Sequence, residues 1–294
     1  MSLSELIHQF NSQPQGVPGS RFASRFRLSG DGRVFVHFAN LVLETVFLPI
    51  TAVASGSTIG HAAALRVLGL STGNPVSADA VFVLPADDDE FVWVDRLVRT
   101  LHALSYLAHP VHGTLLLKVN RRHVMSVPSD HGLSFEEILH ACGLRPQHIT
   151  LEIDADGIED VDHFSRAIAA YRRRGYLISL SGFGRTSVDL SLLGTLHPDI
   201  VKFDRLLLAS ARSLEYLVDR IHDLGASVAI ECPGDAHWQP FAGATRADLI
   251  QHFQPVDRSG ATSPRQSTGA KATPFDQANV RPTVSGLPSR RRPE

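Results

Sequence analysis

The feature that most constrains the fold is a regular alternation of short apolar runs and amphipathic segments between about residues 43 and 251. The apolar runs occupy 43–53, 61–68, 114–119, 148–153, 176–180, 199–203, 226–230 and 247–251. Most of them have the composition of strands buried on both faces, and the first two are joined by a Ser-Gly-Ser turn. Helical periodicity is present at 91–107, 134–143, 164–175 and 214–225. This pattern predicts an α/β protein, a TIM-like (β/α)8 barrel.

Composition distinguishes the two ends of the chain from the barrel segment. Residues 1–40 mix Gly, Pro and Arg with one short apolar segment, so we expect a partly ordered N-terminal extension. Residues 256–294 are rich in Ser, Thr, Gly, Pro and Arg and nearly free of aliphatic side chains. Such a segment buries too little apolar surface to fold, so we expect a disordered C-terminal tail. The barrel domain is therefore predicted over residues 41–255.

Charge and hydropathy limit the classes of partner. A formal net charge of −2 gives no overall attraction to nucleic acid or to acidic membranes. No run reaches the roughly 18 apolar residues that a membrane span needs, and the N-terminus lacks a signal-peptide pattern. The two cysteines have no CxxC spacing, which is typical of reduced thiols. We therefore expect a cytoplasmic protein without a membrane or nucleic-acid partner.

Polar and signature positions lie at or near the ends of the predicted strands. In chain order they are Ala62 with Arg66, Asn120, Glu152, Ser181 with Gly182, Lys202 with Asp204, Glu231 and Gln251. In α/β barrels the active site lies at the carboxyl ends of the strands, so these positions are expected to converge on one rim.

The order and spacing of eight segments resemble the EAL phosphodiesterase domain over about residues 43–255. The segments are VFLPI (46–50), GHAAALRV (60–67), LKVNRRHV (117–124), GLRPQHITLEI (143–153), ISLSGFGRTSVDL (178–190), HPDIVKFDRLLL (197–208), ASVAIECPGD (226–235) and ADLIQ (247–251). The resemblance implies an EAL-type barrel and hydrolysis of a phosphodiester in cyclic di-GMP. It also implies a water activated between two Mg²⁺ or Mn²⁺ ions, which several carboxylates must hold.

The sequence departs from that family's pattern at its metal ligands, so it resembles a degenerate member. The family's signature glutamate falls on Ala62, its paired aspartates fall on Ser181 and Gly182, and one further glutamate falls on Gly234. Lys202, Glu152 and Glu231 remain as remnants of the catalytic set, and the alternative role of Glu152 is an ion pair with Lys202. We therefore expect no bound metal, no cofactor and no catalytic residue, and the chain is predicted not to be an enzyme.

Ligand binding is a separate question from turnover. The family positions that contact the ligand's phosphate and a guanine region are present as Arg66 and Asp204, and the amides Asn120 and Gln251 also remain. The leading hypothesis is a catalytically inactive regulatory module that acts through contacts with an unidentified protein partner in cyclic di-GMP-related signalling. Two alternatives stay open: a cyclic di-GMP receptor that binds without hydrolysis, and a residual cyclic di-GMP phosphodiesterase.

Overall fold

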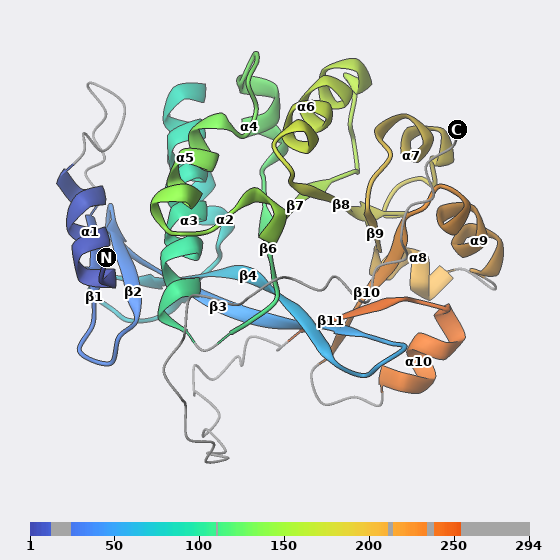
Figure 1. The fold of residues 1–294 in the computed structure, drawn as a ribbon, viewed down its shortest axis with the longest axis horizontal. Coiled ribbons are helices and arrows are strands. Elements are labelled where there is room, and N and C mark those ends of the chain that lie inside the picture. The colour runs from blue at the N-terminus through green and yellow to red at the C-terminus, as the bar shows by residue number, and fades with distance from the viewer. Residues whose placement is uncertain (13–24, 110, 211–213, 234–237, 254–294) are drawn as a thin grey trace.

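The computed structural model describes residues 1–12, 25–109, 111–210, 214–233 and 238–253 (Figure 1). Within these residues, eight strands close into a barrel that helices surround. The strands are β3 (Leu41–Ala52), β4 (Thr58–Gly69), β6 (Thr114–Lys118), β7 (Ile149–Asp154), β8 (Leu177–Phe183), β9 (Ile200–Phe203), β10 (Ser227–Pro233) and β11 (Leu249–Phe253). The predicted TIM-like (β/α)8 barrel is therefore confirmed.

The ring closes through one strand of opposite direction. Strands β4, β6, β7, β8, β9, β10 and β11 pair in parallel, each with the next around the ring. Strand β3 pairs antiparallel with both β4 and β11, which closes the barrel. Because the seven parallel strands run the same way, their carboxyl ends meet at one mouth.

Helices cover the outside of the barrel. They are α2 (Asp79–Phe82), α3 (Asp88–Ala108), α4 (Arg121–Ser126), α5 (Leu133–Ala141), α6 (Val161–Arg173), α7 (Leu190–Leu196), α8 (Arg205–Ser210), α9 (Glu215–Asp223) and α10 (Trp238–Thr245), with a 3-10 turn at Pro146–His148. Caps fix several of their starts; for example, Asp87 accepts a hydrogen bond from the Glu90 amide at 2.8 Å at the start of α3. The main apolar core lies between these helices and the outward faces of the strands.

A smaller apolar cluster fills the barrel itself. Its buried members come only from strands: Leu48, Ile50, Ala52, Ala62, Leu116, Ile200, Ala229 and Leu249. Side chains two positions apart on a strand point to the same face. The inward positions that follow Leu116, Ile200, Ala229 and Leu249 are Lys118, Lys202, Glu231 and Gln251. The interior therefore changes within one step from an apolar floor to a polar mouth.

The N-terminal residues add to the sheet outside the barrel. Helix α1 (Leu3–Ser12) is followed by β1 (Arg25–Leu28) and β2 (Val34–Phe38), and β2 pairs antiparallel with the first half of β3. Short β5 (Pro75–Val76) pairs with β4. The predicted tail, 256–294, lies outside the described residues. No helix in the described ranges combines the length and the apolar character that crossing a membrane requires.

Candidate ligand site at the mouth of the barrel

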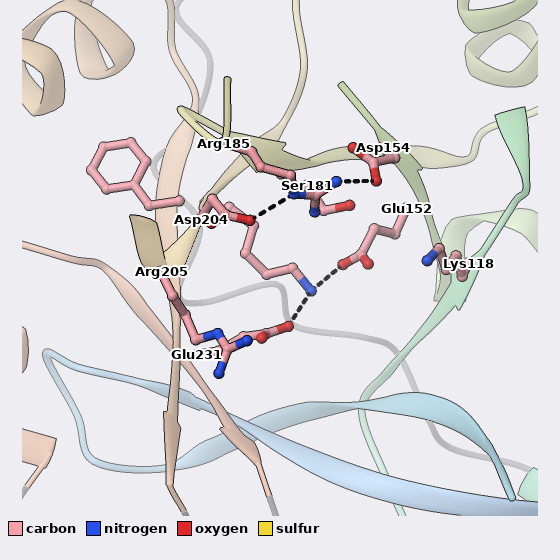
Figure 2. Close-up of a pocket in the computed structure, with 11 residues that line it drawn as sticks. Lys118, Glu152, Asp154, Ser181, Arg185, Asp204, Arg205 and Glu231 are labelled. Atoms are coloured by element: carbon pink, nitrogen blue, oxygen red, sulfur yellow. Dashed lines mark hydrogen bonds and ion pairs between the residues drawn. The ribbon is translucent and has the colours of Figure 1, made fainter. Parts of the chain in front are cut away.

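A cavity of about 200 Å³ opens at the carboxyl ends of β6 to β10 (Figure 2). It is lined by Lys118, Glu152, Asp154, Ser181, Gly182, Arg185, Lys202, Phe203, Asp204, Arg205 and Glu231. Four of these side chains are cationic (Lys118, Arg185, Lys202 and Arg205) and four are carboxylates (Glu152, Asp154, Asp204 and Glu231), so the lining is formally neutral. How these charges pair decides what the cavity can bind.

Lys202 is the centre of the deeper of two charge clusters. Its Nζ lies 2.6 Å from Glu152 Oε2 and 3.0 Å from Glu231 Oε1, and it donates a hydrogen bond of 3.2 Å to Gln251 Oε1. The side chains of Lys202 and Glu152 are only 8% and 9% exposed. Burial lowers the pKa of Lys202, but the two carboxylates outweigh burial and hold that pKa above its usual value. Lys202 is therefore a fixed cation whose charge is balanced by carboxylates of the protein itself.

Arg185 is the centre of the shallower cluster. Its Nη1 donates to Asp154 Oδ2 at 2.9 Å and its Nε donates to Asp204 Oδ2 at 3.0 Å. The hydrogen bond to Asp154, opposed by partial burial and assisted by Asp204, raises the pKa of Arg185. Burial raises the pKa of Asp204, but the Leu206 amide and Arg185 outweigh burial and lower it overall. This guanidinium connects the end of β7 with the segments that follow β8 and β9.

Two cations at the mouth have no such partner. Lys118 and Arg205 are exposed side chains, and neither forms an ion pair with a residue in the described part of the chain. In Figure 2 they lie on either side of Glu152 and Glu231. Since all four carboxylates of the lining are already paired with Lys202 or Arg185, Lys118 and Arg205 remain available to an anion.

The residues predicted to bind ligand do not all reach this cavity. Asp204 lines it, and Gln251 lies beneath it against Lys202. Asn120 instead caps α4, accepting from the Arg122 amide at 2.9 Å. Arg66 is outside the lining and lies 3.9 Å from Glu44, its directly opposite neighbour on β3. The sequence predicts that these four side chains lie together, whereas in the structure Asp204 lines the cavity, Gln251 lies next to it, and Asn120 and Arg66 lie elsewhere.

The positions predicted to have lost metal ligands also lie in different places. Ala62 belongs to the apolar floor, in register with Leu48 and Leu116. Ser181 and Gly182 line the cavity at the end of β8, while Gly234 falls outside the described residues.

The residues present do not fit a pair of divalent ions. Such ions need several oxygen ligands with uncommitted charge, but Glu152 and Glu231 are held by Lys202, and Asp154 and Asp204 are held by Arg185. Within the described ranges, no three His, Cys, Asp or Glu side chains are grouped so that they could hold a metal ion.

Sequence reasoning missed four of the eight charged residues that line the cavity. Arg185, Lys118, Asp154 and Arg205 were not among the predicted site residues. Lys118 carries a usable signal, since a charged residue interrupts an otherwise apolar inward face two positions after Leu116. Arg185 carries a weaker one, a basic residue directly after the Gly-Phe-Gly turn at the end of a predicted strand.

Comparison with known proteins supports the resemblance seen in the sequence. The EAL domain family model matches residues 36–251. The uncharacterized EAL-domain containing protein YkuI of Bacillus subtilis is 34% identical over 79 residues, which is 26% of this chain and 19% of YkuI.

Solved EAL structures share the fold. The structure of B. subtilis YkuI with cyclic di-GMP and calcium superposes with a TM-score of 0.59 at 22% identity, covering 71% of this chain and 54% of YkuI. Klebsiella pneumoniae BlrP1, in a calcium and cyclic di-GMP complex, gives 0.60 at 21% identity, covering 85% of this chain and 63% of BlrP1. The chain thus spans between half and two thirds of these structures.

One sequence-based prediction is corrected by these comparisons. A further structural neighbour, described as the PaMucR phosphodiesterase in complex with cyclic di-GMP, gives a TM-score of 0.55 at 19% identity and covers 72% of this chain and 89% of that protein. Together with the EAL family model that matches residues 36–251, this neighbour contradicts the prediction that the chain is not an enzyme, and that prediction is withdrawn. It took the loss of carboxylates at Ala62, Ser181 and Gly182 as loss of activity, and loss of ligands at those positions does not by itself establish inactivity.

Proposed function

The chain belongs to the EAL domain family, and on that premise we propose that it binds cyclic di-GMP at the mouth of its barrel. The structures of YkuI, BlrP1 and PaMucR were each determined with this dinucleotide. They share the barrel with this chain, so the mouth is the place to test first.

The observation that carries the proposal is the pair of uncommitted cations, Lys118 and Arg205. A cyclic dinucleotide has two phosphodiesters, each with one negative charge, and needs positive charge at the site. The carboxylates that would repel it are neutralised within the protein by Lys202 and Arg185. A charge-assisted hydrogen bond contributes about 1.5–3 kcal/mol, so each cation is worth roughly tenfold to a hundredfold in affinity.

The size of the cavity indicates which part of the ligand enters it. At about 200 Å³ it is smaller than the pocket of a whole drug-sized ligand, which is typically about 300–1,000 Å³. We therefore place the sugar-phosphate ring in the cavity and the bases outside it. Arg66, which the sequence predicts as a phosphate contact, would have to leave Glu44 in order to take part.

Calorimetric titration of the full chain with cyclic di-GMP, in Mg²⁺ and in EDTA, tests the proposal. Lys118→Gln and Arg205→Gln are each expected to weaken binding by about tenfold or more. The control Arg246→Gln removes an exposed arginine from the loop before β11, where it pairs with Asp219 of α9, and should leave affinity within about twofold. Wild-type protein that gives no heat, or variants that all bind equally, would contradict the proposal.

Chromatography of the same samples separates binding from turnover. The appearance of linear dinucleotide would show that bound ligand is hydrolysed, and its dependence on Mn²⁺ would show whether a metal takes part. Regulation through a protein partner remains a prediction made from the sequence.

A further inference from the structure

Gly182 leaves space at the mouth that Arg185 fills. The glycine has φ of +70°, a conformation that other residues rarely adopt. A Cβ built on it would lie 2.5 Å from Asp154 Oδ1 and 3.0 Å from Arg185 Nη2. Any side chain at position 182 would therefore compete with the guanidinium for the same space.

The guanidinium lies among carboxylates at the carboxyl ends of two other strands, β7 and β9. Asp154 and Asp204 lie 2.9 and 3.0 Å from its nitrogens, and Asp156 Oδ2 lies 3.9 Å from Nη1. One cation thus serves three carboxylates at the end of a strand where the family pattern has aspartates and this chain has Ser181 and Gly182. Arg185 lies in the same turn as Ser181 and Gly182. The arginine and the loss of the two carboxylates both make the charge of this turn more positive.

We propose that Arg185 is a resident cation of the mouth, which neutralises Asp154 and Asp204 in place of divalent metal so that a phosphodiester ligand binds without added ions. The proposal rests on the proposed function for the identity of the ligand. Its claim about Arg185 and metal can be tested without any ligand.

Removing the guanidinium should raise the affinity of the mouth for divalent metal ions. In Arg185→Gln, Asp154, Asp156 and Asp204 would lose the cation that lies between them. Mn²⁺ and Mg²⁺ prefer such oxygen ligands. The variant should therefore acquire divalent-ion binding, a gain that loss of a merely structural contact would not produce.

The first experiment titrates MnCl₂ alone into the full-length wild-type chain, Arg185→Gln, Arg185→Lys and the control Arg246→Gln. We expect Arg185→Gln to bind Mn²⁺ at least about tenfold more tightly than the other three, because each of those keeps a cation among the carboxylates. Equal Mn²⁺ affinity in wild type and Arg185→Gln, with both folded by circular dichroism, would overturn the proposal.

The second experiment titrates cyclic di-GMP in EDTA and in Mn²⁺. Wild-type affinity is expected to be the same in both within about twofold. In Arg185→Gln it should fall by about tenfold in EDTA and recover in Mn²⁺. Wild-type binding that requires Mn²⁺ would overturn the proposal even if Arg185→Gln does not fold.

The two experiments separate this inference from the proposed function. Absence of any cyclic di-GMP binding by wild type would end the proposed function, while the MnCl₂ titration would still decide the role of Arg185. Wild-type binding of cyclic di-GMP that requires Mn²⁺ would support the proposed function and overturn the proposed role of Arg185.

Discussion

Replacing Lys202 with methionine should destabilise the protein by several kcal/mol, because it leaves a buried carboxylate without its counter-ion. Lys202 Nζ lies 2.6 Å from Glu152 Oε2, and the Glu152 side chain is 9% exposed. Methionine preserves most of the side-chain volume, so the change removes charge rather than packing.

The expected magnitude follows from the distance and the burial. With an effective dielectric of about 20, two unit charges 2.6 Å apart attract by about 6 kcal/mol. Part of this is regained because the variant no longer buries an ammonium. Glu231 is 33% exposed and can turn to water, so it adds little to the loss. Removal of one partner of a buried pair typically costs about 3–5 kcal/mol, and we expect that range here.

Urea denaturation of wild type, Lys202→Met, Glu152→Gln and the double variant measures this cost. The double variant should recover at least about half of the loss, since neither charge is then left unpaired. The control Lys118→Met removes an exposed lysine from the same mouth and should change the free energy of unfolding by no more than about 0.5 kcal/mol.

The pH dependence of the deficit follows from the titration of Lys202. The pKa of Lys202 is raised above its usual value, so its contribution is complete below about pH 10 and is lost only as the pH rises through the folded-state pKa. Titration of Lys202 should therefore not change the deficit of Lys202→Met between about pH 6 and pH 9. A deficit under about 1 kcal/mol, or no recovery in the double variant, would show that the pair does not stabilise the fold.

Three further predictions follow from other parts of the structure. Burial raises the pKa of Asp95, but Arg99 and His123 outweigh it and lower that pKa, so Asp95→Asn should cost about 3–5 kcal/mol at pH 7 in urea denaturation, with the deficit shrinking below about pH 4. Gly132 has φ of +87° and its Cβ would lie 2.9 Å from a tyrosine ring, so Gly132→Ala should cost about 1–3 kcal/mol by the same assay. A chain ending at Pro255 keeps all eight barrel strands and should melt within a few degrees of the full chain in calorimetry.

The barrel could be predicted because most of its strands are buried on both faces. Each of the eight predicted runs corresponds to an observed barrel strand, and helix α3 covers the segment expected to be helical at 91–107. The strands β1 and β2 were not predicted, because only every second residue of β2 is fully buried and the segment is too short for alternation to be distinctive. Their role became visible only through pairing with β3.

The mouth could be located but its charge pairing could not be predicted. Strand ends identified Glu152, Lys202 and Glu231, which do lie together. Arg185 escaped notice because its position depends on two glycines, Gly182 and Gly184, whose positive φ angles turn the chain back over the cavity. Periodicity carries no information about such a turn. For the same reason, the family resemblance that implied Arg66 as a phosphate contact did not reveal its neighbour Glu44 on β3.

The antiparallel closing strand has a consequence for synthesis on the ribosome. Thr51 on β3 lies 2.9 Å from the ring of His252 on β11, a contact between residues 201 positions apart. During translation the edge of β3 near residue 51 therefore stays unpaired until β11 has been synthesised, when almost the whole domain has emerged. Until then the nascent barrel is an open sheet, and open edges pair readily with other chains. A chain that ends before residue 249 would lack β11 and leave the edges of β3 and β10 exposed. We expect chaperones and proteases to bind such a chain.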